Sequence, residues 1–220
     1  MKKSLQISES LLLVVILTLS GGFMDAYSYL CRDHVFANAQ TGNILLFGVN
    51  LSMGDFTLAL RYLFPVLSFA FGIAIAEIIR HRFYNAKRFH WRQAVLITEA
   101  IILLFVAFLP QDLNLLANSL ISFACGAQVE SFRTLNGCGV ATTMCIGNLR
   151  AGIEALCNYC FTKDKIERKN SFLYLGIIAA FVIGAVIGNL FINLWGEKAI
   201  IVSVMLVLTG FALMFIKKED

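Results

Sequence analysis

The segment GGFMDAYSYL at residues 21–30 decides the fold, because it returns in altered form as GAQVESFRTL at residues 126–135. In both copies an acidic residue follows the leading glycine by four positions, as Asp25 and as Glu130. Each copy lies in or beside an apolar stretch long enough to cross a bilayer, where a carboxylate is costly and usually has a partner or a task. The two copies therefore predict a membrane protein built from two related halves.

The similarity extends well beyond these ten residues. When the chain is shifted by 105 residues, residues 21–45 align without gaps on residues 126–150, with identical Gly-Asn pairs at 42–43 and 147–148. The match resumes at a shift of 112, and the seven extra residues fit a charged loop at 163–169. This pattern indicates an internal duplication rather than two glycine-bearing helices that are similar only by composition.

The second part of the alignment brings together small residues spaced four apart. Gly72 and Ala76 in one half correspond to Gly184 and Gly188 in the other. Small residues at this spacing let membrane helices approach closely. We expect them to pack helices between the two halves of one chain. Association of two copies into a homodimer through the same residues is the alternative.

The composition supports a membrane protein. The chain of 220 residues is 59% hydrophobic and 15% charged, whereas soluble domains are about 45–50% apolar and about 25% charged. With two prolines and no linker-like stretch, residues 1–220 are predicted to form a single integral membrane domain. The net charge is +4, and the basic residues lie in short clusters between apolar runs. This pattern is typical of loops between membrane spans rather than of a nucleic-acid-binding surface, so the expected partner is the lipid bilayer.

Six apolar segments are long enough to span a bilayer, which needs about 20 residues. They lie at about 11–31, 57–80, 93–110, 113–133, 171–195 and 198–216. Two further segments, 35–52 and 139–160, are shorter or more polar. We expect these two to be broken or re-entrant helices, although full crossing by one or both is the alternative.

The basic clusters select among these topologies, because Lys and Arg concentrate on the cytoplasmic side. The clusters lie at Lys2–Lys3, 80–92, 163–169 and Lys217–Lys218. Six crossings place all four inside. Eight crossings separate the two large clusters, and seven leave the first cluster outside. The prediction is an all-α polytopic bundle with six transmembrane helices and both termini in the cytoplasm.

Three crossings per half would turn the second half upside down relative to the first. The repeats would then run over about 11–110 and about 113–216. Many transporters are built from inverted repeats of this kind, with the binding site near mid-membrane where helices are broken. We therefore look for function in the two polar segments.

Both polar segments carry residues suited to a broken helix. The first holds Asn38, Gln40 and the triplet Thr41-Gly42-Asn43, and the second holds Gly147 and Asn148. Glycine permits close backbone approach, and asparagine caps helices. Two half-helices beginning near these residues would direct their N–H groups at an anion or a polar path. The alternative is tight packing between symmetric helices.

Asp25 and Glu130 are the leading candidates for binding a cation or relaying a proton. Alternatively, each carboxylate accepts hydrogen bonds from N–H groups of the nearby broken segment. Arg150 and Glu154 are spaced for an ion pair on one helix face. Glu99, inside the predicted span 93–110, is a weaker site candidate.

The motifs Gly22-Phe23-Met24-Asp25-Ala26 and Thr41-Gly42-Asn43 resemble the signature of the YoaK-like bacterial membrane proteins, also called the domain of unknown function 1275. The resemblance covers essentially the whole chain, and its one departure is Gln40, where the family more often has Met. It implies a bacterial inner-membrane protein of undefined activity and supplies no substrate.

Other chemistries find little support. Cys157-x-x-Cys160 has no second pair for a zinc site, and the three histidines form no ligand spacing. No nucleophile triad or phosphate-binding loop is present, so we expect no enzyme, metal or cofactor. The leading hypothesis is a transporter or channel for a small solute or ion. The alternative is a non-transporting structural, sensor or stress-related membrane protein.

Overall fold

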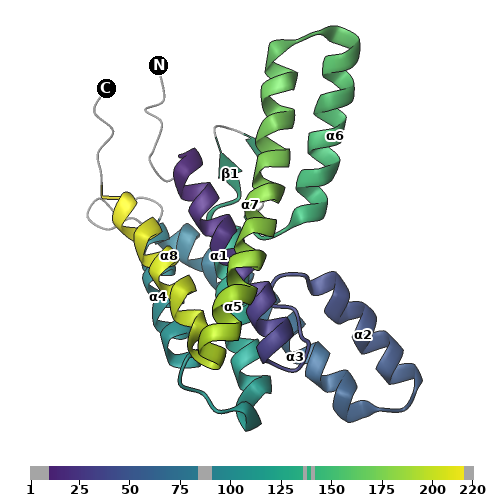
Figure 1. Ribbon diagram of the computed structural model, residues 1–220, viewed down its shortest axis with the longest axis vertical. Helices are drawn as coiled ribbons and strands as arrows, with labels where there is room; N and C mark the ends of the chain where they lie inside the picture. The colour runs from purple at the N-terminus through teal and green to yellow at the C-terminus, as the bar shows by residue number, and fades with distance from the viewer. Residues whose placement is uncertain (1–9, 84–90, 136–137, 140–141, 216–220) are drawn as a thin grey trace.

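The computed structural model describes residues 10–83, 91–135, 138–139 and 142–215. Within these ranges the chain is helical apart from one antiparallel pair of two-residue strands, β1 (Thr134–Leu135) and β2 (Cys138–Gly139). Figure 1 shows the helices gathered into one bundle with two projecting hairpins. The helices are α1 (Leu11–Cys31), α2 (Gln40–Ser52), α3 (Phe56–Phe83), α4 (Trp91–Val106), η2 (Gln111–Leu113), α5 (Asn114–Ser131), α6 (Cys145–Thr162), α7 (Lys165–Trp195), η3 (Gly196–Ile200) and α8 (Ile201–Leu213).

Each of the six predicted spans overlaps one helix, namely α1, α3, α4, α5, α7 and α8, although α4 has only 16 residues and α8 only 13. Three segments of the described chain are both long and apolar enough to cross a membrane: Leu11–Cys31, Phe56–Phe83 and Lys165–Leu213. The last of these joins α7, η3 and α8. The basic residues Lys2, Lys3, Lys87, Arg88, Lys217 and Lys218 lie outside the described residues.

The predicted charged loop at 163–169 is wrong in its extent. The turn is confined to two residues, since α6 ends at Thr162 and α7 begins at Lys165. Lys163 turns the chain with a left-handed φ of 56°, and Asp164 caps α7 by accepting a hydrogen bond from the Ile166 amide at 2.9 Å. The extra residues of the second half therefore lengthen the α6–α7 hairpin, which projects from the bundle in Figure 1.

Helices from the two halves of the chain pack against each other in reciprocal pairs. In the centre α1 packs on α7, α3 packs on α5, and α4 packs on α8. Within each half, α2 packs on α3 and α6 packs on α7. The first long helix of each half thus contacts the third helix of the other half.

Glycines make the two central contacts close enough for backbone to touch backbone. A Cβ atom on Gly22 would overlap the carbonyl oxygen of Phe181, and a Cβ atom on Gly126 would overlap that of Phe69. Gly184 and Gly72 meet the facing helices equally closely, against Leu19 and Phe123. Such small-residue contacts hold membrane helices together through packing rather than through hydrophobic burial.

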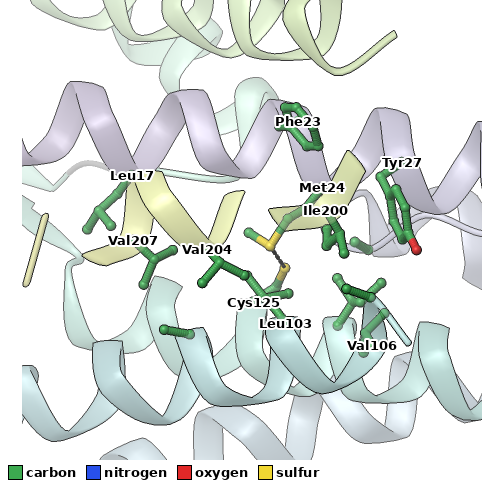
Figure 2. Close-up of a cluster of buried hydrophobic side chains, with 14 of the residues drawn as sticks. Leu17, Phe23, Met24, Tyr27, Leu103, Val106, Cys125, Ile200, Val204 and Val207 are labelled. Atoms are coloured by element: carbon green, nitrogen blue, oxygen red, sulfur yellow. Dashed lines mark hydrogen bonds between the residues drawn. The ribbon is translucent and has the colours of Figure 1, made fainter. Parts of the chain in front are cut away.

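The core lies between α1, α4, α5 and α8. Figure 2 shows Leu17, Met24, Leu103, Cys125 and Val204 pointing toward one another from these four helices. The Cys125 thiol donates to the Met24 sulfur at 3.8 Å. The outward faces carry many exposed large apolar side chains, as expected where lipid replaces water.

Candidate functional site

Two helices begin directly at the Gly-Asn pairs that the sequence repeats. α2 starts at Gln40 and α6 starts at Cys145, so both Gly-Asn pairs lie in first turns. Neither N-cap residue, Ala39 or Met144, provides a side-chain cap. The first N–H groups of a helix need other partners, and they favour negative charge.

Asp25 binds the backbone of the segment just before α2. Its Oδ1 accepts a hydrogen bond from the Asn38 amide at 2.7 Å, and the amides of Ala37 and Ala39 also face the carboxylate. The side chain is buried, with 8% of its surface exposed. The acid of the first repeated motif therefore holds the segment before α2 to α1.

The segments that precede α2 and α6 meet at Gly21 of α1. The Asn38 side-chain amide donates to the Gly21 carbonyl oxygen at 3.1 Å. A Cβ atom on Gly21 would lie 2.9 Å from Thr143 Cγ2 and 3.4 Å from the Thr142 carbonyl oxygen. Among the described residues the buried Asn38 Oδ1 and Thr143 Oγ1 atoms have no hydrogen-bond partner. We call this meeting point of Asn38, Thr142 and Thr143 at Gly21 the junction.

Asn43 closes the loop in front of α2. Its Oδ1 accepts from the Phe36 amide at 3.0 Å, and its Nδ2 donates to the Phe36 carbonyl oxygen and to Gln40 Oε1, both at 2.8 Å. Gln40 in turn donates to the Ala37 carbonyl oxygen at 2.7 Å and to Ser122 Oγ at 3.4 Å. In the second copy Asn148 is equally buried.

The carboxylate of the second motif lies in different surroundings. Glu130 forms an ion pair with Arg133 at 3.0 Å and interacts with Glu77. The glycine contacts explain the difference. The sequence alignment pairs Gly21 with Gly126, but in the structure it is Gly22 that makes the contact equivalent to that of Gly126, a shift of one residue. Glu130 therefore does not occupy, in the second half of the chain, the position that Asp25 occupies in the first.

Among the described residues the most buried carboxyl group is that of Glu99 on α4, with 1% of the residue's surface exposed. It faces the side chain of Gln128 on α5, which also contacts Thr142 just before α6. The sequence shows Glu99 as an acid inside an apolar run. It gives no sign that Gln128, aligned with an apolar residue of the first copy, faces that acid.

Arg32 is a second residue that the sequence does not single out. It is fully buried, and its guanidinium donates to the carbonyl oxygens of Val106, Leu109 and Pro110 at 2.9–3.3 Å. Further bonds join it to Tyr27 Oη and Asn114 Oδ1. A cation at these carbonyl groups satisfies the C-terminal end of α4 and its dipole.

The residues predicted to pack helices together lie at helix contacts. Gly188 packs against Ala26, and Ala76 is fully buried beside Trp91 and Ala127. Arg150 and Glu154 lie 3.9 Å apart on the exposed face of α6. In the described part of the chain no group of three or more His, Cys, Asp or Glu residues is placed to hold a metal ion.

A largely helical bundle with an apolar exterior and a buried polar junction defines an integral membrane protein. The chain belongs to the family described as a protein of unknown function, DUF1275, whose family model matches residues 13–213. It is 28% identical over 181 residues to the UPF0700 transmembrane protein YoaK of Bacillus subtilis (strain 168), covering 78% of this chain and 76% of that protein. No solved structure matches the chain.

Proposed function

We propose that the chain is a transporter or channel for a small solute or ion, built from two inverted repeats that each cross the membrane three times. The single observation that carries this proposal is the junction at Gly21, where the approaches to α2 and α6 meet. Irregular backbone inside a membrane protein is tolerated where it is buried or lines a polar path. In transporters such breaks near mid-membrane form the binding site.

The reciprocal packing supports the inverted arrangement. A half-turn that exchanges α1 with α5 and α3 with α7 also exchanges the two central contacts, Gly22 on Phe181 and Gly126 on Phe69. The same operation exchanges α2 with α6 and α4 with α8. A chain of this kind fits the cytoplasmic membrane of a bacterium with both termini inside.

The charge of the junction favours a cation or a neutral polar solute. Asp25 already places a carboxylate beside the junction, where backbone amides of residues 37–39 face it. The unpartnered oxygen atoms of Asn38 and Thr143 add acceptor capacity, and the Thr143 hydroxyl can also donate. An anion would meet the Asp25 carboxylate, so we expect it to be excluded.

Flux into proteoliposomes tests the proposal across a panel of cations, anions and small neutral metabolites. Thr143→Val keeps the shape of the side chain and removes its hydroxyl, so we expect wild-type yield and lost flux. Asp25→Asn removes the charge and should also reduce flux, at some cost in stability. Glu154→Gln, which alters an exposed acid on α6, is the matched control and should transport normally.

A non-transporting role is the second candidate, and one observation favours it. Asp25 is engaged by backbone amides, as a purely structural acid would be. In that case no member of the solute panel would move in a way that depends on Thr143 or Asp25. Such a result would redirect attention to a scaffold, sensor or stress-related role.

A further inference from the structure

Glu99 lies between a small cavity and the junction of the broken helices. The cavity has a volume of about 40 Å³ and lies between α3, α4 and α5, with Thr98 and Glu99 as its polar lining. Its apolar lining includes Ala76 and Val95. A cavity needs only about 10–15 Å³ to hold one water molecule. The cavity therefore has room for water that can exchange a proton with Glu99.

The side chain of Gln128 bridges Glu99 to the approach of α6. One terminal atom of its amide group lies 2.6 Å from Glu99 Oε1 and 3.2 Å from Oε2. The other terminal atom lies 3.3 Å from Thr142 Oγ1 and 3.4 Å from the Leu17 carbonyl oxygen. Gln128 has no exposed surface, so each end must find its partner among these groups.

The orientation of the amide depends on the proton of Glu99. A protonated carboxyl group donates to the Gln128 oxygen, which leaves the amide nitrogen to donate to the Leu17 carbonyl oxygen and Thr142 Oγ1. An ionised carboxylate requires the nitrogen instead, and the Gln128 oxygen then faces the Leu17 carbonyl oxygen without a hydrogen between them. The protonated arrangement is the one that satisfies every group.

The charges nearby also disfavour an ionised Glu99. Within the described residues no ion pair involves Glu99. The ionisable groups in its surroundings are the Cys125 thiol of α5 and, beyond it, Asp25 of α1, and neither is a cation. α8 carries no ionisable side chain, and Glu77 of α3 is occupied by Arg80 and His81. A lone buried carboxylate is costly, so this site is suited to a carboxyl group that holds a proton.

We infer that Glu99 is a proton-binding site and that Gln128 communicates its protonation to Thr142 at the approach to α6. Loss of the proton to the cavity turns the Gln128 nitrogen toward Glu99 and leaves the Gln128 oxygen facing the Leu17 carbonyl oxygen and Thr142 Oγ1. The Thr142 hydroxyl must then turn to donate to the Gln128 oxygen, and the repulsion between the two carbonyl oxygens weakens the hold on the α6 approach. This inference deepens the proposed function by making the proton a coupling ion, but proton binding itself requires no transport.

Infrared spectroscopy of the membrane-reconstituted protein tests proton binding directly. We expect wild type at neutral pH to show the carbonyl stretch of a protonated carboxyl group, and Glu99→Gln to lack it. Glu154→Gln is the control and should keep the band. Gln128→Leu should shift the band, because the carboxyl group loses its hydrogen-bond partner. A wild-type spectrum with no Glu99-dependent band overturns the inference.

Alkylation of the native Cys145, followed by peptide mass spectrometry, tests the link to α6. Cys145 is half-buried at the first position of that helix. Glu99→Gln keeps a donor toward Gln128 and fixes the protonated arrangement at every pH. The ratio of wild-type to Glu99→Gln labelling cancels the pH dependence of the thiol. We expect it to rise about fivefold at alkaline pH, the effect of one hydrogen bond.

The two readouts separate this inference from the proposed function. A flat labelling ratio overturns the link through Gln128 even if the infrared band is present. A Glu99-dependent band and a rising ratio, together with no solute flux, would support proton binding and reject transport. Flux that is indifferent to Glu99→Gln and to pH would reject the coupling while leaving transport intact.

Discussion

The Arg32 guanidinium donates from Nε to the Tyr27 hydroxyl at 3.1 Å, and that hydroxyl donates onward to the Glu197 carbonyl oxygen at 2.9 Å. The end of α1 is thereby joined to both η3 and the end of α4. Every donor direction of a fully buried cation is directed at a carbonyl, hydroxyl or amide oxygen. This arrangement locks one end of the bundle.

Replacing Arg32 should destabilise the protein strongly. Arg32→Met keeps much of the apolar length but leaves several buried carbonyl groups unpaired, which should lower the free energy of unfolding by about 3 kcal/mol or more. Tyr27→Phe should cost about 1–2 kcal/mol. Thermal unfolding in detergent measures both. Arg61→Met is the control, because Arg61 forms a 3.7 Å ion pair with Asp33 at an exposed site, and it should change little.

Adding a methyl group to Gly22 should disrupt the contact between α1 and α7. The new Cβ atom would overlap the Phe181 carbonyl oxygen, so the helices must separate, at a cost of about 1–3 kcal/mol. Gly176→Ala in α7 is the matched control, since nothing lies within 4 Å of its added Cβ atom. That variant should be neutral or more stable by about 0.5–1 kcal/mol. Equal effects of the two substitutions on unfolding would contradict close packing at Gly22.

Asn43→Leu should reduce the yield of folded protein. The substitution leaves the Phe36 amide and carbonyl groups and Gln40 without their present partner, at a cost of about 1–3 kcal/mol. Size-exclusion profiles in detergent report the folded fraction. The exposed Asn158→Leu provides the comparison and should behave as wild type. Normal folding of Asn43→Leu with lost flux would instead assign Asn43 to the transport path.

Single cysteines introduced on a cysteine-free background test the six-crossing topology. Gln111 Nε2 donates to Glu197 Oε1 at 2.8 Å, so these two residues share one side of the bundle. Lys87→Cys and Lys165→Cys should react with an impermeant reagent from the cytoplasmic side, and Gln111→Cys only from the other side. Labelling of Lys87→Cys and Lys165→Cys from opposite sides would rule out six crossings.

The sequence predicts the helices well because their signal is local. Apolar runs and polar interruptions place α1 to α8 in order, and the Gly-Asn pairs predict the starts of α2 and α6. The helix that replaces most of the predicted loop at 163–169 was harder to see, because a solvated charged helix has the composition of a loop. Its cap at Asp164 is the local signal that could have identified it.

The site residues are less predictable because they depend on partners distant in the chain. Asp25 stands out as an acid in an apolar run, and its partner Asn38 is close in sequence. Glu99 and Gln128 become a pair only when α4 packs on α5. Glu130 aligns with Asp25 in sequence, but a shift of one residue in the glycine contacts gives it different neighbours.

The reciprocal glycine contacts also impose an order on biogenesis. α3 meets α5 soon after both are synthesised, whereas Gly22 of α1 waits for Phe181, which the ribosome produces late. Until α7 is made, we expect the glycine face of α1 to lack its helix partner. We expect chains that end before α7 to expose the glycine face of α1 and to be degraded by quality-control proteases. The stability of the first helix would then depend on completion of the last third of the chain.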